Sequence, residues 1–171
     1  MAIHRLNHAV LYVSDVERSV RFYRDVLGFE VLSELGGPPP QAAFLRAAAS
    51  TNDHDLGLFA IGERAGASTA GRSTVGLYHL AWEVDTLAEL QRIRDVLTER
   101  GALVGASDHG STKALYAQDP DGIEFEVSWL VPAALLDPEQ SISTRPLHLE
   151  REIERYGADT RGGVGVSVPT A

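Results

Sequence analysis

The same order of predicted elements occurs twice in this sequence, and this repetition limits the fold more than any other feature. Each copy has a strand-like segment, an amphipathic helical pattern and three further strand-like segments, near residues 3–62 and again near residues 75–131. Arg24-Asp25-Val26-Leu27 in the first helix is echoed by Arg94-Asp95-Val96-Leu97 in the second. An internal repeat of this size predicts an α+β protein built from two βαβββ modules.

Apolar spacing and capping residues define the two helices. The apolar positions are Val16, Val20, Tyr23 and Leu27 in the first helix, and Leu87, Leu90, Ile93 and Leu97 in the second. Asp15 suits the N-cap of the first helix and Gly28 its C-terminal end, while Gly101 closes the second. Each helix is expected to cover one face of its sheet, so that the modules bury the other faces by curving around each other and leave a cleft.

The sequence predicts one domain over residues 1–131 and a C-terminal extension over residues 132–171. A segment rich in Gly, Ala and Ser, from Glu63 to Thr74, reads as the linker between the modules. In the extension, Pro146 to Tyr156 has the pattern of a short helix. The final stretch from Gly162 to Val168 is either a flexible tail or an arm against a partner subunit.

Composition excludes several classes of partner and site. The formal net charge of −9 argues against a nucleic-acid backbone or an anionic membrane as partner. The chain has no cysteine, so any metal must be held by histidine and carboxylate. No signal-peptide pattern is visible at the N-terminus, and no apolar run approaches the roughly 18 residues of a membrane span. These features predict a soluble, cytoplasmic protein.

Two histidines stand at matching places in the two modules. His8 lies within the first predicted strand, from Ile3 to Val13, and His79 within the corresponding strand, from Leu77 to Val84. In the last predicted strand, from Ile123 to Val131, successive side chains point to opposite faces. One face carries Ile123, Phe125, Val127 and Trp129, and the other carries Glu124, Glu126 and Ser128. Two histidines and one carboxylate form the ligand set that suits Fe(II) and oxygen chemistry.

Each of these residues also has a purely structural interpretation. A single histidine in an apolar strand is more often a core residue bonded to a backbone carbonyl. An acidic row is often a solvated strand face. The pair at repeat-related positions with carboxylates nearby favours a metal site, although alternation does not separate Glu124 from Glu126.

The chain resembles the vicinal oxygen chelate superfamily, which includes glyoxalase I, bleomycin- and fosfomycin-resistance proteins, epimerases and type I extradiol dioxygenases. The resemblance covers about residues 3–131. It rests on the doubled βαβββ order, on Leu6-Asn7-His8-Ala9-Val10-Leu11-Tyr12-Val13, and on Asp119-Pro120-Asp121-Gly122 followed by Glu126. It implies that the two modules pair into a curved, open barrel.

Further segments are similar to one-domain type I extradiol dioxygenases of the catechol 2,3-dioxygenase kind. They are His54-Asp55-Leu56-Gly57-Leu58-Phe59, the segment around His109-Gly110, and Tyr116 ten residues before Glu126. The resemblance implies that His8, His79 and Glu126 are the iron ligands, with Glu126 preferred over Glu124 by its spacing from Asp119. It also implies that His54 is the acid/base, and that Tyr116 and His109 position substrate and intermediate. Taken from the residues alone, His54 and His109 also fit loops, and Tyr116 also fits the core.

The implied function is Fe(II)-dependent extradiol cleavage of a catechol-type ring with O2, in aromatic catabolism, by a homodimer; Mn(II) or another divalent metal is the alternative cofactor. One rival is a non-redox metal enzyme of the glyoxalase or epimerase type. The other is a ligand-sequestering protein like those of bleomycin resistance. Leu56-Gly57-Leu58-Phe59-Ala60-Ile61 offers no fourth ligand, which speaks against the first rival, and a complete set of three speaks against the second.

Overall fold

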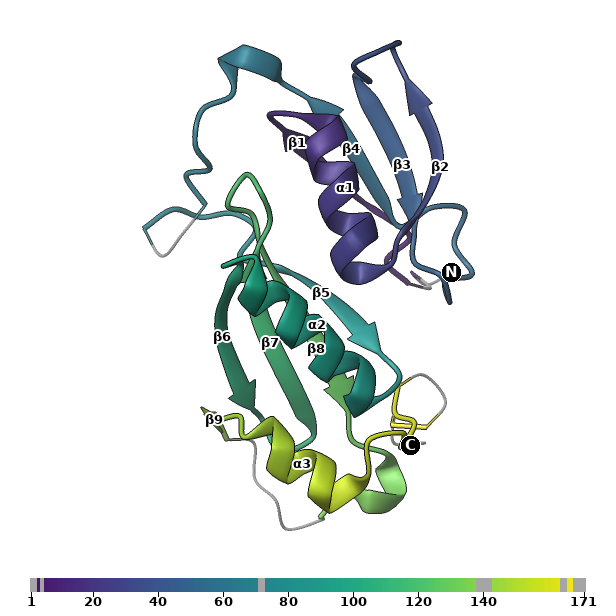
Figure 1. The fold of residues 1–171 in the computed structure, drawn as a ribbon, viewed down its shortest axis with the longest axis vertical. Helices are drawn as coiled ribbons and strands as arrows, with labels where there is room; N and C mark the ends of the chain where they lie inside the picture. Colours follow the sequence, from purple (N-terminus) through teal and green to yellow (C-terminus); the bar gives the residue numbers. More distant parts are fainter. Residues whose placement is uncertain (1–2, 4, 71–72, 138–142, 164–165, 168–171) are drawn as a thin grey trace. The chain divides into compact units, whose positions relative to one another are not determined.

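The computed structural model of this chain describes every residue except 1–2, 4, 71–72, 138–142, 164–165 and 168–171. It divides into two compact units, residues 1–68 with 119–122 and residues 69–118 with 123–171. Each unit contains one mixed sheet with a helix packed on one face (Figure 1). The predicted α+β class with two βαβββ modules is confirmed, and each module has its own mixed sheet. The grouping into one domain over residues 1–131 plus an extension stays a prediction.

The first unit has the predicted βαβββ order. Its elements are β1 (Ala9–Val13), α1 (Val16–Leu27), β2 (Glu30–Leu35), β3 (Ala42–Arg46) and β4 (Leu56–Ala60), followed by a short 3-10 turn, η1 (Gly62–Arg64). The sheet order is β1-β4-β3-β2, with β1 and β4 parallel and the other pairs antiparallel. The two strands in the middle, β3 and β4, supply most of the core beneath α1.

Helix α1 forms where its capping residues and apolar stripe predict it. The Asp15 carboxylate accepts the backbone N–H of Arg18 at 2.9 Å, and Gly28 closes the helix at φ 71°. The buried face includes Tyr23, which is 1% exposed. Burial and the nearby Asp119 raise the pKa of Tyr23, whose hydroxyl donates to the Asp119 carboxylate at 3.1 Å. Burying one such large side chain contributes about 1.5–3 kcal/mol.

The second unit repeats the order and then adds elements at its edge. They are β5 (Leu80–Val84), α2 (Leu87–Glu99), β6 (Leu103–Asp108), β7 (Thr112–Gln118) and β8 (Glu124–Leu130), then η2 (Ala133–Leu135), β9 (Arg145–Pro146) and α3 (Leu149–Tyr156). The sheet order is β5-β8-β7-β6-β9. The short helix predicted from Pro146 begins three residues later, because Arg145 and Pro146 are extended and pair with β6.

The described part of the C-terminal tail packs on its own unit. Gly162 donates its N–H to the Asp85 carbonyl at 2.9 Å, and the Ser167 hydroxyl donates to the Leu130 carbonyl at 2.7 Å. A Cβ at Gly162 would lie 2.0 Å from that Leu130 oxygen, so only glycine fits there. Of the predicted tail, residues 164, 165 and 168 lie outside the described residues.

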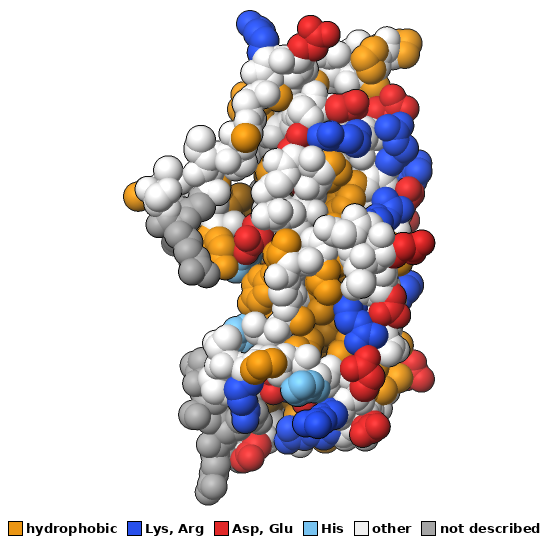
Figure 2. Space-filling model, turned by 60° about the vertical axis from the view of Figure 1, so that its left-hand side comes forward, with side chains coloured by type: hydrophobic (Ala, Val, Ile, Leu, Met, Phe, Trp, Pro, Cys, Tyr) orange, Lys and Arg blue, Asp and Glu red, His pale blue; other side chains and the backbone are white. Residues whose placement is uncertain are grey.

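Acidic and basic side chains are interspersed on the face shown in Figure 2. Several of the ion pairs are local, such as Arg21 with Glu17 on α1 and Arg92 with Glu89 on α2. None of the helices within the described ranges combines the length and apolar character needed to cross a membrane.

Candidate functional site

His8 and His79 each stand one residue before a strand, not inside it as the sequence predicted. Strand β1 begins at Ala9, which pairs with Leu56, and β5 begins at Leu80, which pairs with Phe125. In the first unit the partner strand β4 also begins at Leu56, whereas in the second unit β8 begins at Glu124, one residue before the first pair. The histidines therefore occupy equivalent positions in the two units, just ahead of the first ladder pair.

In the second unit, His79 lies beside Glu126. Its Nε2 is 3.4 Å from Glu126 Oε2, and the two side chains are 24% and 14% exposed. This distance exceeds the usual length of about 2.7–2.9 Å for a charge-assisted hydrogen bond. It matches the separation of about 3.0–3.4 Å expected for two ligands that share one ion at about 2.1 Å. His79 Nδ1 is buried and has no hydrogen-bond partner among the described residues.

Tyr116 lies directly across the sheet from Glu126, on β7. Burial, and then the charge of Glu126 and the hydrogen bond to it, raise the pKa of Tyr116 to about 12. On its other side the Tyr116 hydroxyl is 3.0 Å from His109 Nε2. The His79 ring packs edge-on against the Tyr116 ring at 5.8 Å between centroids. Four of the six predicted site residues thus form one contiguous group in the second unit.

Glu124 occupies the same sheet face one pair nearer the turn, where it faces Gln118. No ion pair joins it to His79 among the described residues, whereas Glu126 has one. The geometry therefore favours Glu126 as the carboxylate that accompanies His79.

The other two predicted residues meet in the first unit. The rings of His8 and His54 are 4.4 Å apart, and His54 also packs edge-on against Phe44 at 5.1 Å. His8 Nδ1 is 2.7 Å from Asn7 Oδ1, and His54 Nδ1 is 2.9 Å from Asp53 Oδ2. Both partners are acceptors, so in each contact Nδ1 is the donor.

The loop that carries His54 is held by Asp55, which is 8% exposed. Its carboxylate accepts the Ala47 N–H at 2.8 Å, the Ser50 hydroxyl at 2.8 Å and the Asn52 amide at 2.7 Å. The same Asn52 amide donates to the Asn7 carbonyl at 2.7 Å. Asp55 therefore fixes both the His54 loop and the segment that leads to His8.

Neither unit by itself brings three metal-ligating side chains together among its described residues. In the second unit, the imidazole of His79 and the carboxylate of Glu126 are donor types that suit a divalent cation, and they have the spacing of two ligands of one ion.

Sequence reasoning missed a buried ion cluster beside His109. Lys113 is fully buried, and its Nζ lies 2.5 Å from Asp108 Oδ1 and 3.0 Å from Glu152 Oε2 of α3. The signal was present in the strand alternation, because Lys113 shares a face with Leu115 and Ala117, which are both completely buried.

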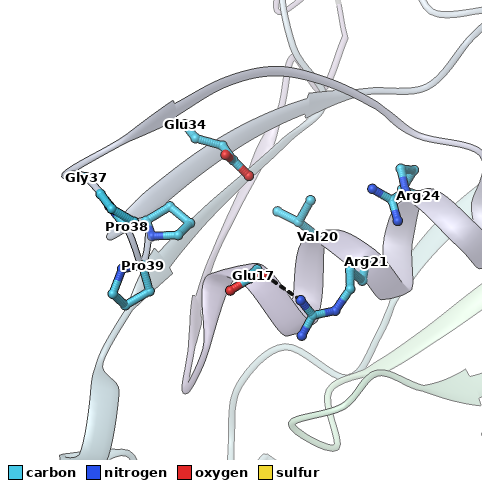
Figure 3. A pocket seen from close by; sticks show the side chains of 9 residues that line it. Glu17, Val20, Arg21, Arg24, Glu34, Gly37, Pro38 and Pro39 are labelled. Carbon is cyan, nitrogen blue, oxygen red and sulfur yellow. Dashed lines mark hydrogen bonds and ion pairs between the residues drawn. The ribbon is translucent and has the colours of Figure 1, made fainter.

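A surface hollow of about 600 Å³ lies elsewhere in the first unit, between α1 and the loop after β2 (Figure 3). It is lined by Glu17, Val20, Arg21, Arg24, Glu34 and residues 37–40. None of the predicted site residues lines it. Its acid and base groups are partly paired with each other, as in the ion pair of Arg21 with Glu17 at 2.7 Å.

Known proteins that are similar to this chain share its fold, and their activities differ from one another. The model of the Glyoxalase/Bleomycin resistance protein/Dioxygenase superfamily matches residues 5–127. A catechol-2,3-dioxygenase of Bacillus subtilis is 34% identical over 71% of this chain, which spans only 40% of that protein's length. A lactoylglutathione lyase of Salmonella typhimurium is 30% identical over 72% of this chain and 90% of its own length.

The crystal structure of a glyoxylase/bleomycin resistance protein/dioxygenase domain from Frankia sp. EAN1pec has a similar fold. The TM-score is 0.62 at 20% identity, over 77% of this chain and 96% of that one.

Proposed function

Because the chain belongs to the Glyoxalase/Bleomycin resistance protein/Dioxygenase superfamily, we propose that it is an extradiol dioxygenase that cleaves a catechol-type ring with O2. Members of this superfamily are mostly metalloenzymes, and we propose His8, His79 and Glu126 as the ligands of Fe(II) in this chain. Mn(II) is the alternative ion.

One observation carries the proposal. The Glu126 carboxylate lies beside His79 Nε2 on one side and the Tyr116 hydroxyl on the other, with His109 behind Tyr116. A site that only sequesters a ligand does not require hydrogen-bonded side chains such as Tyr116 and His109 beside the proposed metal-ligating carboxylate. A ring-opening reaction requires them, because protons must be held and moved beside the substrate oxygens.

In the proposed ring cleavage, the ion and the side chains would have different roles. His8, His79 and Glu126 would hold the ion, which when bound would lower the pKa of a coordinated hydroxyl. His54 would accept a catechol proton at Nε2, since its Nδ1 lies 2.9 Å from the Asp53 carboxylate and donates to it. Tyr116 and His109, which lie 3.0 Å apart, position the substrate and the intermediate beside Glu126.

A lyase or isomerase of the glyoxalase type is the second candidate. The lactoylglutathione lyase relative supports it, since this chain spans 90% of that protein. The proposed ligand set has three members, because β4 supplies no polar side chain from Leu56 to Ala60. Three ligands leave more positions open for a catechol and O2 than four do.

The test begins with anaerobic purification and measurement of the bound metal. A catechol panel is then added with air, and oxygen uptake and a coloured ring-fission product are followed. Dioxygenase activity predicts iron or manganese and one O2 consumed per catechol. Isomerisation of a glutathione hemithioacetal without oxygen uptake would identify the lyase instead.

Matched variants assign the residues. Glu126→Ala is expected to lose the metal and Glu124→Ala to keep it, and the reverse result overturns the choice of carboxylate. His54→Ala is expected to keep the metal and lose about 100-fold or more in kcat. Undiminished turnover in His54→Ala would remove its proposed acid/base role.

A further inference from the structure

The buried lysine Lys113 connects the turn that carries His109 to the C-terminal helix α3. Lys113 lies directly opposite Asp108 in the antiparallel pair of β7 and β6, and its Nζ is 2.5 Å from Asp108 Oδ1. The same ammonium is 3.0 Å from Glu152 Oε2 of α3 and 5.7 Å from the centre of the Tyr156 ring, one helical turn further on. The Lys113 side chain is 0% exposed, so its charge depends on these groups rather than on water.

The carboxylate of Asp108 also fixes the backbone of the turn. Its Oδ1 accepts the N–H of Gly110 at 2.8 Å, which closes the chain around His109 as in an Asx-turn. The His109 N–H donates to the Thr112 carbonyl at 2.9 Å, and Gly110 has a φ of 83°, in the region that favours glycine. The carboxylate oxygen that Lys113 contacts is therefore the one that joins the residues before and after His109.

The ion cluster and the side chain of Tyr116 lie on opposite faces of the sheet. Lys113 shares its face with Leu115 and Ala117, which are both completely buried, and alternation along β7 places Tyr116 on the other face. There His109 Nε2 lies 3.0 Å from the Tyr116 hydroxyl. The cluster can therefore affect the candidate site only through the backbone of the turn, and not by contact with substrate.

The C-terminal segment meets this turn in two places. Strand β9 pairs antiparallel with the end of β6, and Thr144 Oγ1, just before β9, lies 3.2 Å from His109 Nδ1. Glu152 contacts the turn through the lysine. Both Thr144 and Glu152 lie beyond residues 5–127, which the superfamily model matches. The surroundings of His109 thus include a part of the chain outside the matched region.

We propose that Glu152 is a positioning residue for His109, which it holds in place through Lys113 and Asp108. A buried ammonium that loses one of its two carboxylates lowers its free energy by moving toward water, and the Asp108 carboxylate then follows it away from the Gly110 N–H. The turn opens, and His109 loses its fixed place beside Tyr116. The catalytic consequence rests on the function proposed above, but the effect on the turn does not.

The first experiment measures the turn directly, by amide hydrogen exchange of the full chain without added metal. Glu152→Gln keeps the shape of the side chain and removes its charge. The matched control is Glu150→Gln on the same helix, which breaks the ion pair of α3 with Arg94 of α2 instead. In Glu152→Gln the Gly110 amide is expected to exchange about 10-fold faster or more, with the amide of Ile93 in α2 within about twofold of wild type.

Three results of this experiment would overturn the inference. One is an unchanged Gly110 exchange rate in Glu152→Gln. Another is an equal increase at Gly110 in Glu150→Gln, because any weakening of α3 would then have the same effect. The third is an equal increase at Gly110 and Ile93, which would show a general loss of stability.

The second experiment measures turnover of a catechol by the metal-loaded enzyme in a double-mutant cycle. The kcat of Glu152→Gln is expected to fall about 10-fold, and that of Glu150→Gln to stay within about twofold of wild type. In a His109→Ala background, Glu152→Gln is expected to change kcat by less than about twofold, because its effect acts through His109. A further 10-fold loss in that background overturns the positioning role. If wild type cleaves no catechol, the proposed function fails, while the exchange of Gly110 still decides whether Glu152 fixes the turn.

Discussion

The two units share one chain order and differ at the position next to the first ladder pair. In the first unit Ala9 pairs with Leu56, and in the second Leu80 pairs with Phe125. The next residues on the partner strands are Gly57 and Glu126. At this position the second unit therefore has the carboxylate of Glu126, whereas the first has Gly57, which has no side chain.

Packing does not require the glycine. A Cβ at Gly57 would lie 3.5 Å from Val10 Cγ2 and 3.6 Å from Phe44 Cε1, which is ordinary van der Waals contact. The difference between the units at this position is therefore one of side-chain chemistry rather than of space. Two copies of one module can differ in a single side chain, so that only the second offers a carboxylate here.

Gly57→Glu is expected to have the largest effect, because it gives the first unit the carboxylate of the second. A fourth ligand would occupy a position that substrate or O2 needs, and dioxygenase activity is expected to fall by about 100-fold or more. Oxygen uptake and bound-metal content are measured, with Gly57→Ala as the size control. If Gly57→Glu keeps the activity and metal content of Gly57→Ala, the equivalence of Gly57 and Glu126 is wrong.

The units also hold their second histidine in different ways. The His54 loop is fixed by one buried carboxylate, Asp55, which accepts three neutral donors. The His109 turn is fixed by a buried ammonium between two carboxylates. Removing one member of an ion cluster that is shielded from water lowers the stability of the fold strongly, because the remaining charges lose their partner.

Lys113→Met is accordingly expected to destabilise the protein by about 3–5 kcal/mol, since it leaves the mostly buried carboxylates of Asp108 and Glu152, 14% and 13% exposed, without this cation. Denaturant unfolding measures this. The control is Arg92→Met, which breaks a largely exposed pair with Glu89 and is expected to cost less than about 1 kcal/mol. Equal losses in the two variants would show that the Lys113 cluster contributes no more than a surface pair.

The sequence predicted what depends on local order, such as α1 between Asp15 and Gly28. It extended β1 and β5 too far, because the residue at which a strand pair begins depends on tertiary pairing, which the local pattern does not contain. The repeat identified His8 and His79 as equivalent. No local pattern shows that Thr144 Oγ1 lies 3.2 Å from His109 Nδ1, since that contact depends on the pairing of β9 with β6.

Asp55→Ala is expected to cost about 1–3 kcal/mol, less than the loss at Lys113, because it leaves neutral donors rather than charges without partners. The neighbouring Asp53→Ala is the matched control. Its side chain is 92% exposed, and its removal is expected to change stability by about 0.5 kcal/mol or less. A loss at Asp53 as large as that at Asp55 would show that the loop is not held by the buried carboxylate.

The smallest expected effect is the pH dependence that Asp108 gives the second unit. Burial acts to raise the pKa of Asp108, but the hydrogen bond from Lys113 and the Gly110 N–H outweigh it, so the pKa is lowered. A carboxyl with a lowered folded-state pKa stabilises the protein above its unfolded pKa, near about 4, and this contribution is lost as the pH falls through the folded value. Asp108→Asn is therefore expected to flatten the acid limb of stability measured by urea unfolding between about pH 6 and 3. The exposed Asp53→Asn should leave that limb unchanged, and an equally steep limb in Asp108→Asn would mean that other carboxylates, and not this ion cluster, set the acid stability.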